Sequence, residues 1–264
     1  MRRPRVLTLV LAAVCGVATT DCGPSGSGSS ASSSRSGSGA VSGTITVFAA
    51  ASLKESFTGL GRQFESLHAG TKVMFNFGPS SGLAAQIAQG APADVFASAS
   101  TKNMTRVTDA ELASSATTFA RNVMAVAVPV TNPARVTQLS DLGRPAVKVA
   151  VCQSTVPCGA TAAKVFANAG LKVTAVSQEV DVKAVLAKVT LGEVDAGVVY
   201  VTDLRSAGAK VKGIAIPEDM NASTDYPIAT LSTSANKTTA QAFTDLVLSG
   251  QGTSALARAG FARP

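Results

Sequence analysis

Hydrophobic and polar positions change their spacing between residues 44 and 67. In residues 44–48, threonines alternate with isoleucine and valine, which is the period of a strand. From Leu53 to Leu67, apolar residues recur every three or four positions, which predicts one buried face of a helix. Small residues and Ser52 lie between the two patterns. We therefore expect a strand that runs through a tight turn directly into a helix.

A strand that ends at a helix N-terminus is suited to binding an anion. The first N–H groups of the helix have no partner within the helix, and the helix dipole places its positive end there. Ser52 adds a hydroxyl to these groups. A serine at this place is also a favoured helix cap, so its position alone leaves both roles open. The pattern favours capture of a small oxyanion, with Ser52 as one of its ligands.

Strand and helix patterns continue to alternate along the rest of the chain. Such alternation predicts an α/β fold with a mainly parallel sheet flanked by helices. The expected strands are residues 44–48, 72–77, 94–98, 123–128, 147–151, 196–200, 211–216 and 228–231. The expected helices are residues 53–67, 83–89, 101–110, 160–169, 182–189, 238–248 and 254–259, with a turn at residues 78–82.

Polar groups and turns recur where these strands end. They are Ser52, the Ser80-Ser81 pair, the turn at Cys158, the turn before Val182, and Tyr200. In open α/β sheets, ligands bind beyond the carboxyl ends of the strands. The five positions could therefore converge on one cleft.

Composition and charge exclude several classes of function. The chain has 264 residues and a formal net charge of +7, but its lysines and arginines are scattered and are not interleaved with aromatic residues. A nucleic-acid partner is therefore not expected. The sequence shows no carboxylate pair, phosphate-binding loop or cluster of metal ligands. We expect a binding protein without a cofactor, not an enzyme.

The main enzymatic alternative rests on Ser80. Residues 78–82 read Gly-Pro-Ser-Ser-Gly and match the G-x-S-x-G pattern of serine hydrolases. The single histidine, His68, precedes Ser80, whereas a hydrolase of this type has its histidine after the serine. The S-x-x-K arrangement also fails, because Leu83 stands at the lysine position. A serine hydrolase using Ser80 is therefore the weaker hypothesis.

The N-terminal residues predict export and attachment to a membrane. Residues 1–21 read as a signal peptide, with a basic start followed by a short apolar run. Cys22 and a stretch rich in Ser, Gly and Ala follow, so residues 22–43 are expected to form a flexible tether. This order resembles a bacterial lipoprotein with lipidated Cys22, on the outer face of the cytoplasmic membrane. Lipidation at Cys15 and plain secretion are the alternatives.

Cys152 and Cys158 stand close together in an exported chain, which favours a disulfide. Their five-residue separation matches neither a redox C-x-x-C motif nor a zinc knuckle, and no histidine lies nearby.

Several short motifs stand out along the chain. They are Phe48-Ala49-Ala50-Ala51-Ser52-Leu53, Ser80-Ser81 followed by Leu83-Ala84-Ala85-Gln86-Ile87, Gly90-Ala91-Pro92-Ala93-Asp94-Val95-Phe96, Val156-Pro157-Cys158-Gly159, Gly197-Val198-Val199-Tyr200, Pro217-Glu218-Asp219 and Tyr226-Pro227. Together these motifs resemble the molybdate-binding proteins of ABC transporters. The resemblance runs from Thr44 to the C-terminus, in order and at similar spacing.

This resemblance implies the type II periplasmic-binding-protein fold, with two lobes and a two-strand hinge near residues 123–128 and 228–231. Residues 44–122 and 226–264 would form the first lobe, and residues 123–225 the second. The oxyanion would be held by Ser52 and Ser80 through hydroxyl and backbone N–H groups, by Cys158 and Val182 through backbone N–H groups, and by the Tyr200 phenol. Ser81, next to Ser80, is the alternative ligand.

The function implied is a monomeric receptor that binds molybdate, with tungstate as a near equivalent. It would deliver the anion to the permease and ATPase of an ABC importer. A receptor for sulfate or another tetrahedral oxyanion is the alternative of the same class. A surface-anchored interaction protein that binds no oxyanion is the alternative of another class.

Overall fold

The computed structural model describes residues 40–113 and 115–264, which form one compact unit. The predicted signal peptide, the lipidation sites at Cys15 and Cys22, and most of the predicted tether lie outside the described residues. Within the described residues, no helix combines the length and apolar character that crossing a membrane would require.

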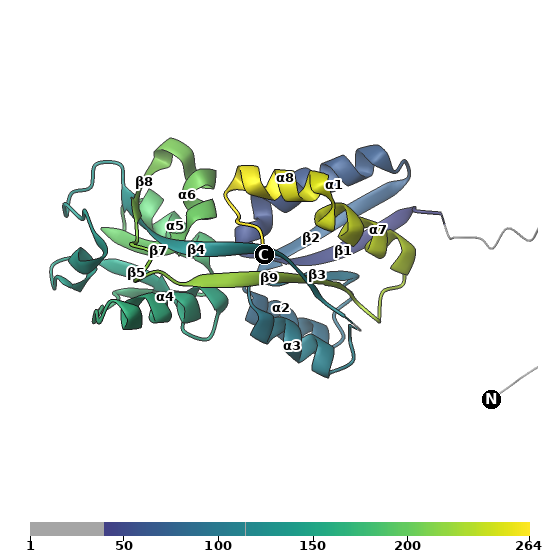
Figure 1. The fold of residues 1–264 in the computed structure, drawn as a ribbon, viewed down its shortest axis with the longest axis horizontal. Helices are drawn as coiled ribbons and strands as arrows, with labels where there is room; N and C mark the ends of the chain where they lie inside the picture. Colours follow the sequence, from purple (N-terminus) through teal and green to yellow (C-terminus); the bar gives the residue numbers. More distant parts are fainter. Residues whose placement is uncertain (1–39, 114) are drawn as a thin grey trace, which may run out of the picture. The chain divides into compact units, whose positions relative to one another are not determined.

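The described residues alternate between strands and helices, as Figure 1 shows. The strands are β1 (Gly43–Ala50), β2 (Thr71–Gly78), β3 (Val95–Ala97), β4 (Thr117–Pro129), β5 (Val149–Cys152), β6 (Ser177–Glu179), β7 (Ala196–Tyr200), β8 (Val211–Ala215) and β9 (Ser223–Thr230). The helices are α1 (Lys54–Leu67), α2 (Ser80–Ala88), α3 (Thr101–Asp109), α4 (Pro157–Asn168), α5 (Val182–Thr190), α6 (Val201–Ala207), α7 (Lys237–Leu248) and α8 (Gly250–Ala259). This confirms the predicted α/β class.

The strands form one mixed sheet in the order β2-β1-β3-β9-β4-β7-β5-β6, with β8 also paired to β4. Pairing is parallel among β1, β2 and β3, and again among β5, β6 and β7. Every antiparallel pair includes β4 or β9. The sheet is therefore less parallel than expected, because two long strands run against their neighbours between two parallel groups.

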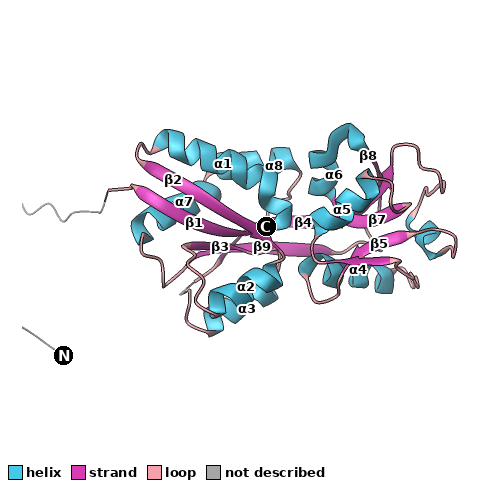
Figure 2. Ribbon diagram, turned by 180° about the vertical axis from the view of Figure 1, so that it is seen from behind, coloured by secondary structure: helices cyan, strands magenta, loops and turns pink. Residues whose placement is uncertain are grey.

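The hydrophobic core divides at these two long strands. The members of one cluster of buried residues belong to residues 124–216 of the sequence, and those of two other clusters belong to residues 45–120 and 226–261. We use lobe 1 for the elements β1–β3, α1–α3, α7 and α8, and lobe 2 for β5–β8 and α4–α6. Figure 2 shows α1 and α8 on one side of the lobe 1 strands, with α2 and α3 on the other.

The chain passes between the lobes along β4 and β9. Residues 117–123 of β4 pair with β9, and residues 124–127 pair with β7. The second expected crossing, residues 228–231, is wrong in position: residues 228–230 pair with β3 inside lobe 1, so the crossing lies upstream. Proline lacks the N–H that a central strand donates, so Pro227 is not expected inside a strand and the sequence does not predict the full length of β9. The register shifts opposite Pro227, between Thr118 and Ala120, so that the strand continues past it.

Two helices that carry candidate ligands begin earlier than the sequence predicted, as does α8, which begins at Gly250 instead of Ser254. Helix α2 begins at Ser80 and α4 at Pro157, so residues assigned to turns form first helical turns. The ring of Pro157 fixes a helical φ at a position where no N–H is needed. Both shifts place candidate ligands at helix N-termini. Helix α6 and strand β6 had not been predicted.

Candidate functional site

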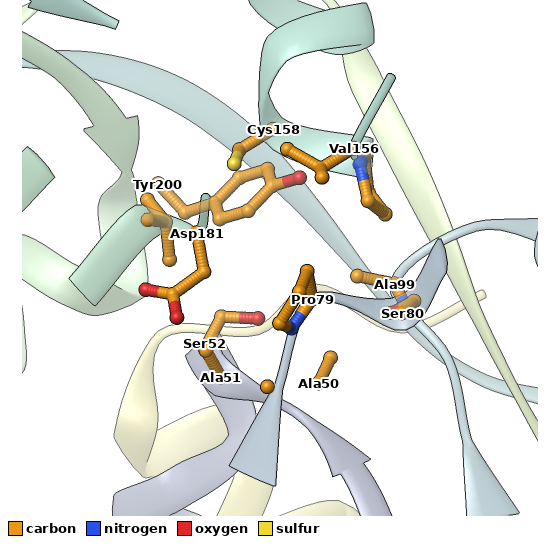
Figure 3. A pocket seen from close by; sticks show the side chains of 13 residues that line it. Ala50, Ala51, Ser52, Pro79, Ser80, Ala99, Val156, Cys158, Asp181 and Tyr200 are labelled. Atoms are coloured by element: carbon orange, nitrogen blue, oxygen red, sulfur yellow. The ribbon is translucent and has the colours of Figure 1, made fainter. Parts of the chain in front are cut away.

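All five predicted ligand residues line one small pocket between the lobes. Its walls contain Ser52, Ser80, Cys158, Val182 and Tyr200. Figure 3 shows the Ser52 hydroxyl and the Tyr200 ring on facing walls of this pocket. The cavity measures about 20 Å³. That is more than one ordered water needs, about 10–15 Å³, and far less than the roughly 300–1,000 Å³ of sites for organic ligands.

Helix N-termini surround the pocket. Ser52 lies in a short 3-10 turn, Ala51–Leu53, which leads from β1 into α1. Ser80 and Val182 are the first residues of α2 and α5, and Cys158 is the second residue of α4. N–H groups at these positions have no acceptor within their own helix. Backbone donors and the positive ends of helix dipoles therefore face a common space.

The two serine hydroxyls are held in place by neighbours. The Ser80 Oγ is buried and accepts a hydrogen bond from the Ala99 N–H at 2.9 Å, which leaves its own proton to donate. The Ser52 Oγ lies 2.8 Å from the Tyr226 phenol oxygen. When Tyr226 donates in this pair, the Ser52 proton is also available to a ligand.

Tyr200 supplies a polar atom that the protein leaves unsatisfied. Its side chain is buried, and its phenol oxygen has no hydrogen-bond partner among the described residues. Burial is the main cause that raises the pKa of Tyr200 well above its usual value, so the phenol is a neutral donor. Burial also raises the pKa of Tyr226. A buried hydroxyl without a partner is costly unless a ligand accepts its hydrogen bond.

The residues that line the pocket include no lysine and no arginine. The one charged group is Asp181, whose carboxylate caps α5 by accepting the Ala184 N–H at 3.0 Å. The described residues also contain no cluster of three or more histidine, cysteine or carboxylate side chains that could hold a metal ion. The pocket therefore offers neutral N–H and O–H donors, which suits an anion held by oriented dipoles.

The predicted disulfide between Cys152 and Cys158 is present, with 5.7 Å between the Cα atoms. It joins the end of β5 to the first turn of α4. Gly159 follows, and a Cβ on it would lie 1.9 Å from the Gln153 carbonyl oxygen, so only glycine fits there. The disulfide and this close backbone approach together fix the N-terminus of α4 at the pocket.

A buried carboxylate accepts a hydrogen bond from the backbone of Tyr200. Asp203, in the first turn of α6, is fully buried and accepts the Tyr200 N–H at 3.1 Å. Its other oxygen lies 3.2 Å from the Lys183 ammonium. Burial raises the pKa of Asp203 to about 6, although Lys183 acts in the opposite direction.

Sequence reasoning missed the residues that support the ligands. Tyr226 belongs to one of the motifs above, but the sequence assigns no role to it or to Asp203 and Lys183. Asp181 carries the one usable signal, an aspartate immediately before an apolar helical pattern. The contacts of Tyr226 with Ser52 and of Lys183 with Asp203 join distant parts of the chain, so no local pattern could reveal them, whereas Asp203 lies only three positions from the Tyr200 N–H that it accepts.

The geometry does not support the hydrolase hypothesis. His68 ends α1 and packs on Phe64, with ring centroids 4.6 Å apart. Ser80 lies just beyond the opposite end of β2, on the order of 20 Å away along the strand. Ser80 therefore has no imidazole within reach as a general base.

Residues 45–262 match the family model of bacterial extracellular solute-binding proteins. The chain is 41% identical over 222 residues to the molybdate-binding protein ModA of Mycobacterium tuberculosis, covering 84% of this chain and 85% of that protein. The solved molybdate-binding protein of Azotobacter vinelandii is similar in fold, with a TM-score of 0.74, 21% identity, and coverage of 83% and 99%. The sulfate-binding protein SubI of M. tuberculosis has a TM-score of 0.72, 19% identity, and coverage of 83% and 86%.

Proposed function

This chain belongs to the family of bacterial extracellular solute-binding proteins, and we propose that its pocket binds molybdate. A solute-binding protein holds its ligand without chemical change, so the prediction of a non-enzyme is confirmed. Similarity of fold does not select the anion, because receptors of molybdate and of sulfate share it. The 41% identity to a molybdate-binding protein favours molybdate over sulfate.

The observation that carries the proposal is the convergence of neutral donors on a cavity of about 20 Å³. A tetrahedral dianion needs many short hydrogen bonds in several directions when water is removed from it. Ser52 and Ser80 would donate from lobe 1. Cys158 and Val182 would donate backbone N–H groups from lobe 2, and Tyr200 its phenol. Tungstate has the same charge and shape, so the site would bind it as well.

The proposed mechanism is closure of two domains around the anion. Residues 44–122 with 226–264 would form one domain and residues 123–225 the other. Strands β4 and β9 are the continuous connections between the separate cores, so bending there would open the cleft. The closed form would present the anion to the permease and ATPase of an ABC importer. We propose a monomer, exported by residues 1–21 and tethered to the membrane through a lipid on Cys22.

Calorimetric titration of the chain from Ala40 onward with molybdate, tungstate, sulfate and phosphate tests this function. We expect one-to-one binding of the first two anions and no binding of the others. Preference for sulfate or phosphate would contradict the choice of anion. Failure to bind any of the four would favour an interaction protein that binds no oxyanion.

Serine variants test the site itself. Ser52→Ala and Ser80→Ala should each weaken molybdate binding by roughly 1.5–3 kcal/mol, the value of one hydrogen bond to a charged group. Ser81→Ala is the matched control, because Ser81 is adjacent in sequence but lines a neighbouring cleft instead of this pocket. Parent-like affinity of both test variants, or a loss confined to Ser81→Ala, would show that the ligands are assigned wrongly.

A further inference from the structure

One ion pair connects the two sides of the cleft. The Lys183 ammonium, in the first turn of α5 in lobe 2, lies 2.8 Å from the Glu55 carboxylate, in the first turn of α1 in lobe 1. The other ion pairs of the described residues lie within one lobe or, for Arg121 and Asp225, join β4 to β9. The Lys183–Glu55 pair therefore reports on the distance between the two lobes.

Lobe 2 holds the lysine in place for this contact. Its ammonium also lies 3.2 Å from the Asp203 carboxylate and donates a hydrogen bond to the Ser206 hydroxyl at 3.0 Å. The Asp203 side chain is fully buried and that of Lys183 is 21% exposed, whereas that of Glu55 is 52% exposed. A cation already fixed by a buried partner loses little further freedom when Glu55 approaches.

The residues in these contacts lie next to residues that line the anion pocket. Val182, which lines the pocket, precedes Lys183, and Asp203 accepts the Tyr200 N–H. On the other lobe, Glu55 lies one turn after Ser52. The ion pair thus connects residues next to Val182 and Tyr200, on the lobe 2 wall of the pocket, with a residue close to Ser52, on the lobe 1 wall.

A second polar contact crosses between the lobes on the same side. Arg205 of α6 reaches the carbonyl oxygens of Ala257 and Arg258, at the C-terminus of α8, at 3.4 Å each. Cations are favoured at the negative end of a helix dipole. Both crossing contacts require the lobes to be close together.

We propose that Lys183 and Glu55 form a latch that keeps the cleft closed and sets how long the anion remains bound. The inference rests on the proposed function, since it concerns release of the anion from the same pocket. Lys183 acts here as a positioning residue, with Asp203 as its fixed anchor. Opening of the cleft separates Lys183 from Glu55 and leaves the Lys183–Asp203 pair intact within lobe 2.

Glu55→Gln is the most informative variant, because Glu55 is half exposed and its replacement leaves Asp203 paired with Lys183. We expect radiolabelled molybdate to leave this variant about two- to fivefold faster than the parent, as for loss of a partly exposed ion pair. Association should change little. Release from the parent should accelerate with salt more steeply than release from Glu55→Gln, because salt screens the pair.

Lys188→Met is the matched control. Lys188 lies on the same helix, but its carboxylate partners, Glu179 and Glu193, belong to lobe 2. The Lys188→Met variant should release molybdate at the same rate as the parent. A parent-like rate and salt dependence for Glu55→Gln would overturn the latch, as would equal acceleration by Lys188→Met. If the parent itself binds no molybdate, the proposed function fails, and with it the latch.

A double variant checks the same contact from lobe 2. Lys183→Met combined with Asp203→Asn removes the cation without leaving a buried charge unpaired. Its release rate should rise at least as much as that of Glu55→Gln, and adding Glu55→Gln to it should cause no further increase. A further increase would show that Glu55 acts without Lys183 and would overturn the proposal.

Discussion

Replacing Tyr200 by phenylalanine should have opposite effects on stability and on binding. The phenol oxygen is buried and has no hydrogen-bond partner among the described residues. An unsatisfied buried polar group costs about 1–3 kcal/mol, so removing the hydroxyl should raise the free energy of unfolding of the ligand-free protein by up to that amount. The ring can keep its edge-to-face contact with Tyr226, at a centroid distance of 6.3 Å.

The same substitution removes a proposed donor to the anion. A hydrogen bond to a charged acceptor contributes about 1.5–3 kcal/mol. Molybdate affinity should therefore fall by about 10- to 150-fold. Urea unfolding without ligand measures the first effect, and calorimetric titration measures the second.

Tyr226→Phe is the matched control for the stability measurement. Its hydroxyl is bonded to the Ser52 hydroxyl at 2.8 Å, so its loss should destabilise the ligand-free protein. Two results would refute the reasoning about Tyr200: a phenylalanine variant that is clearly less stable than the parent without ligand, or one that binds molybdate with parent affinity.

Three further predictions concern the supports of the site. Burial raises the pKa of Asp203 to about 6 from an ordinary value of 3.8, so the folded protein retains this proton to higher pH than the unfolded chain. Its contribution to stability should therefore fall by about 2 kcal/mol as the pH rises from 4 to 6. The difference in free energy of unfolding between the parent and Asp203→Asn, measured by urea unfolding across this range, should show this slope, and a difference that does not change with pH would contradict it. Reduction of the Cys152–Cys158 disulfide frees a short loop and should lower the free energy of unfolding by about 2 kcal/mol. Urea unfolding with and without reductant measures this change, and unchanged midpoints would argue against a stabilising role of the disulfide. Gly159→Ala places a methyl group against the Gln153 carbonyl and should lower both the free energy of unfolding and the affinity for molybdate. Gly59→Ala, in open space on α1, is the control and should lower neither. Equal behaviour of the two variants in urea unfolding and in titration would exclude the steric argument.

The sequence by itself determined the elements and where their ligands would lie along the chain. The alternation from residues 44–48 to residues 53–67 identified β1 and α1, because both patterns are set by which side chains must be buried. Five candidate positions were recognised because carboxyl ends of parallel strands share one edge of a sheet. Parts of two helices, α2 and α4, were mistaken for turns, since Pro and Gly mark turns as well as first helical turns.

Only the tertiary structure decided what supports those positions and how the two lobes connect. The continuation of β9 through Pro227 depends on a register shift in β4, a hundred residues away. The partner of the Ser52 hydroxyl lies 174 positions along the chain, and the partner of Lys183 across the cleft lies 128 positions away. Local patterns record burial and backbone preference, which act over a few residues. Pairings of single polar atoms arise when distant elements pack together, and the sequence does not reveal them before the chain has folded.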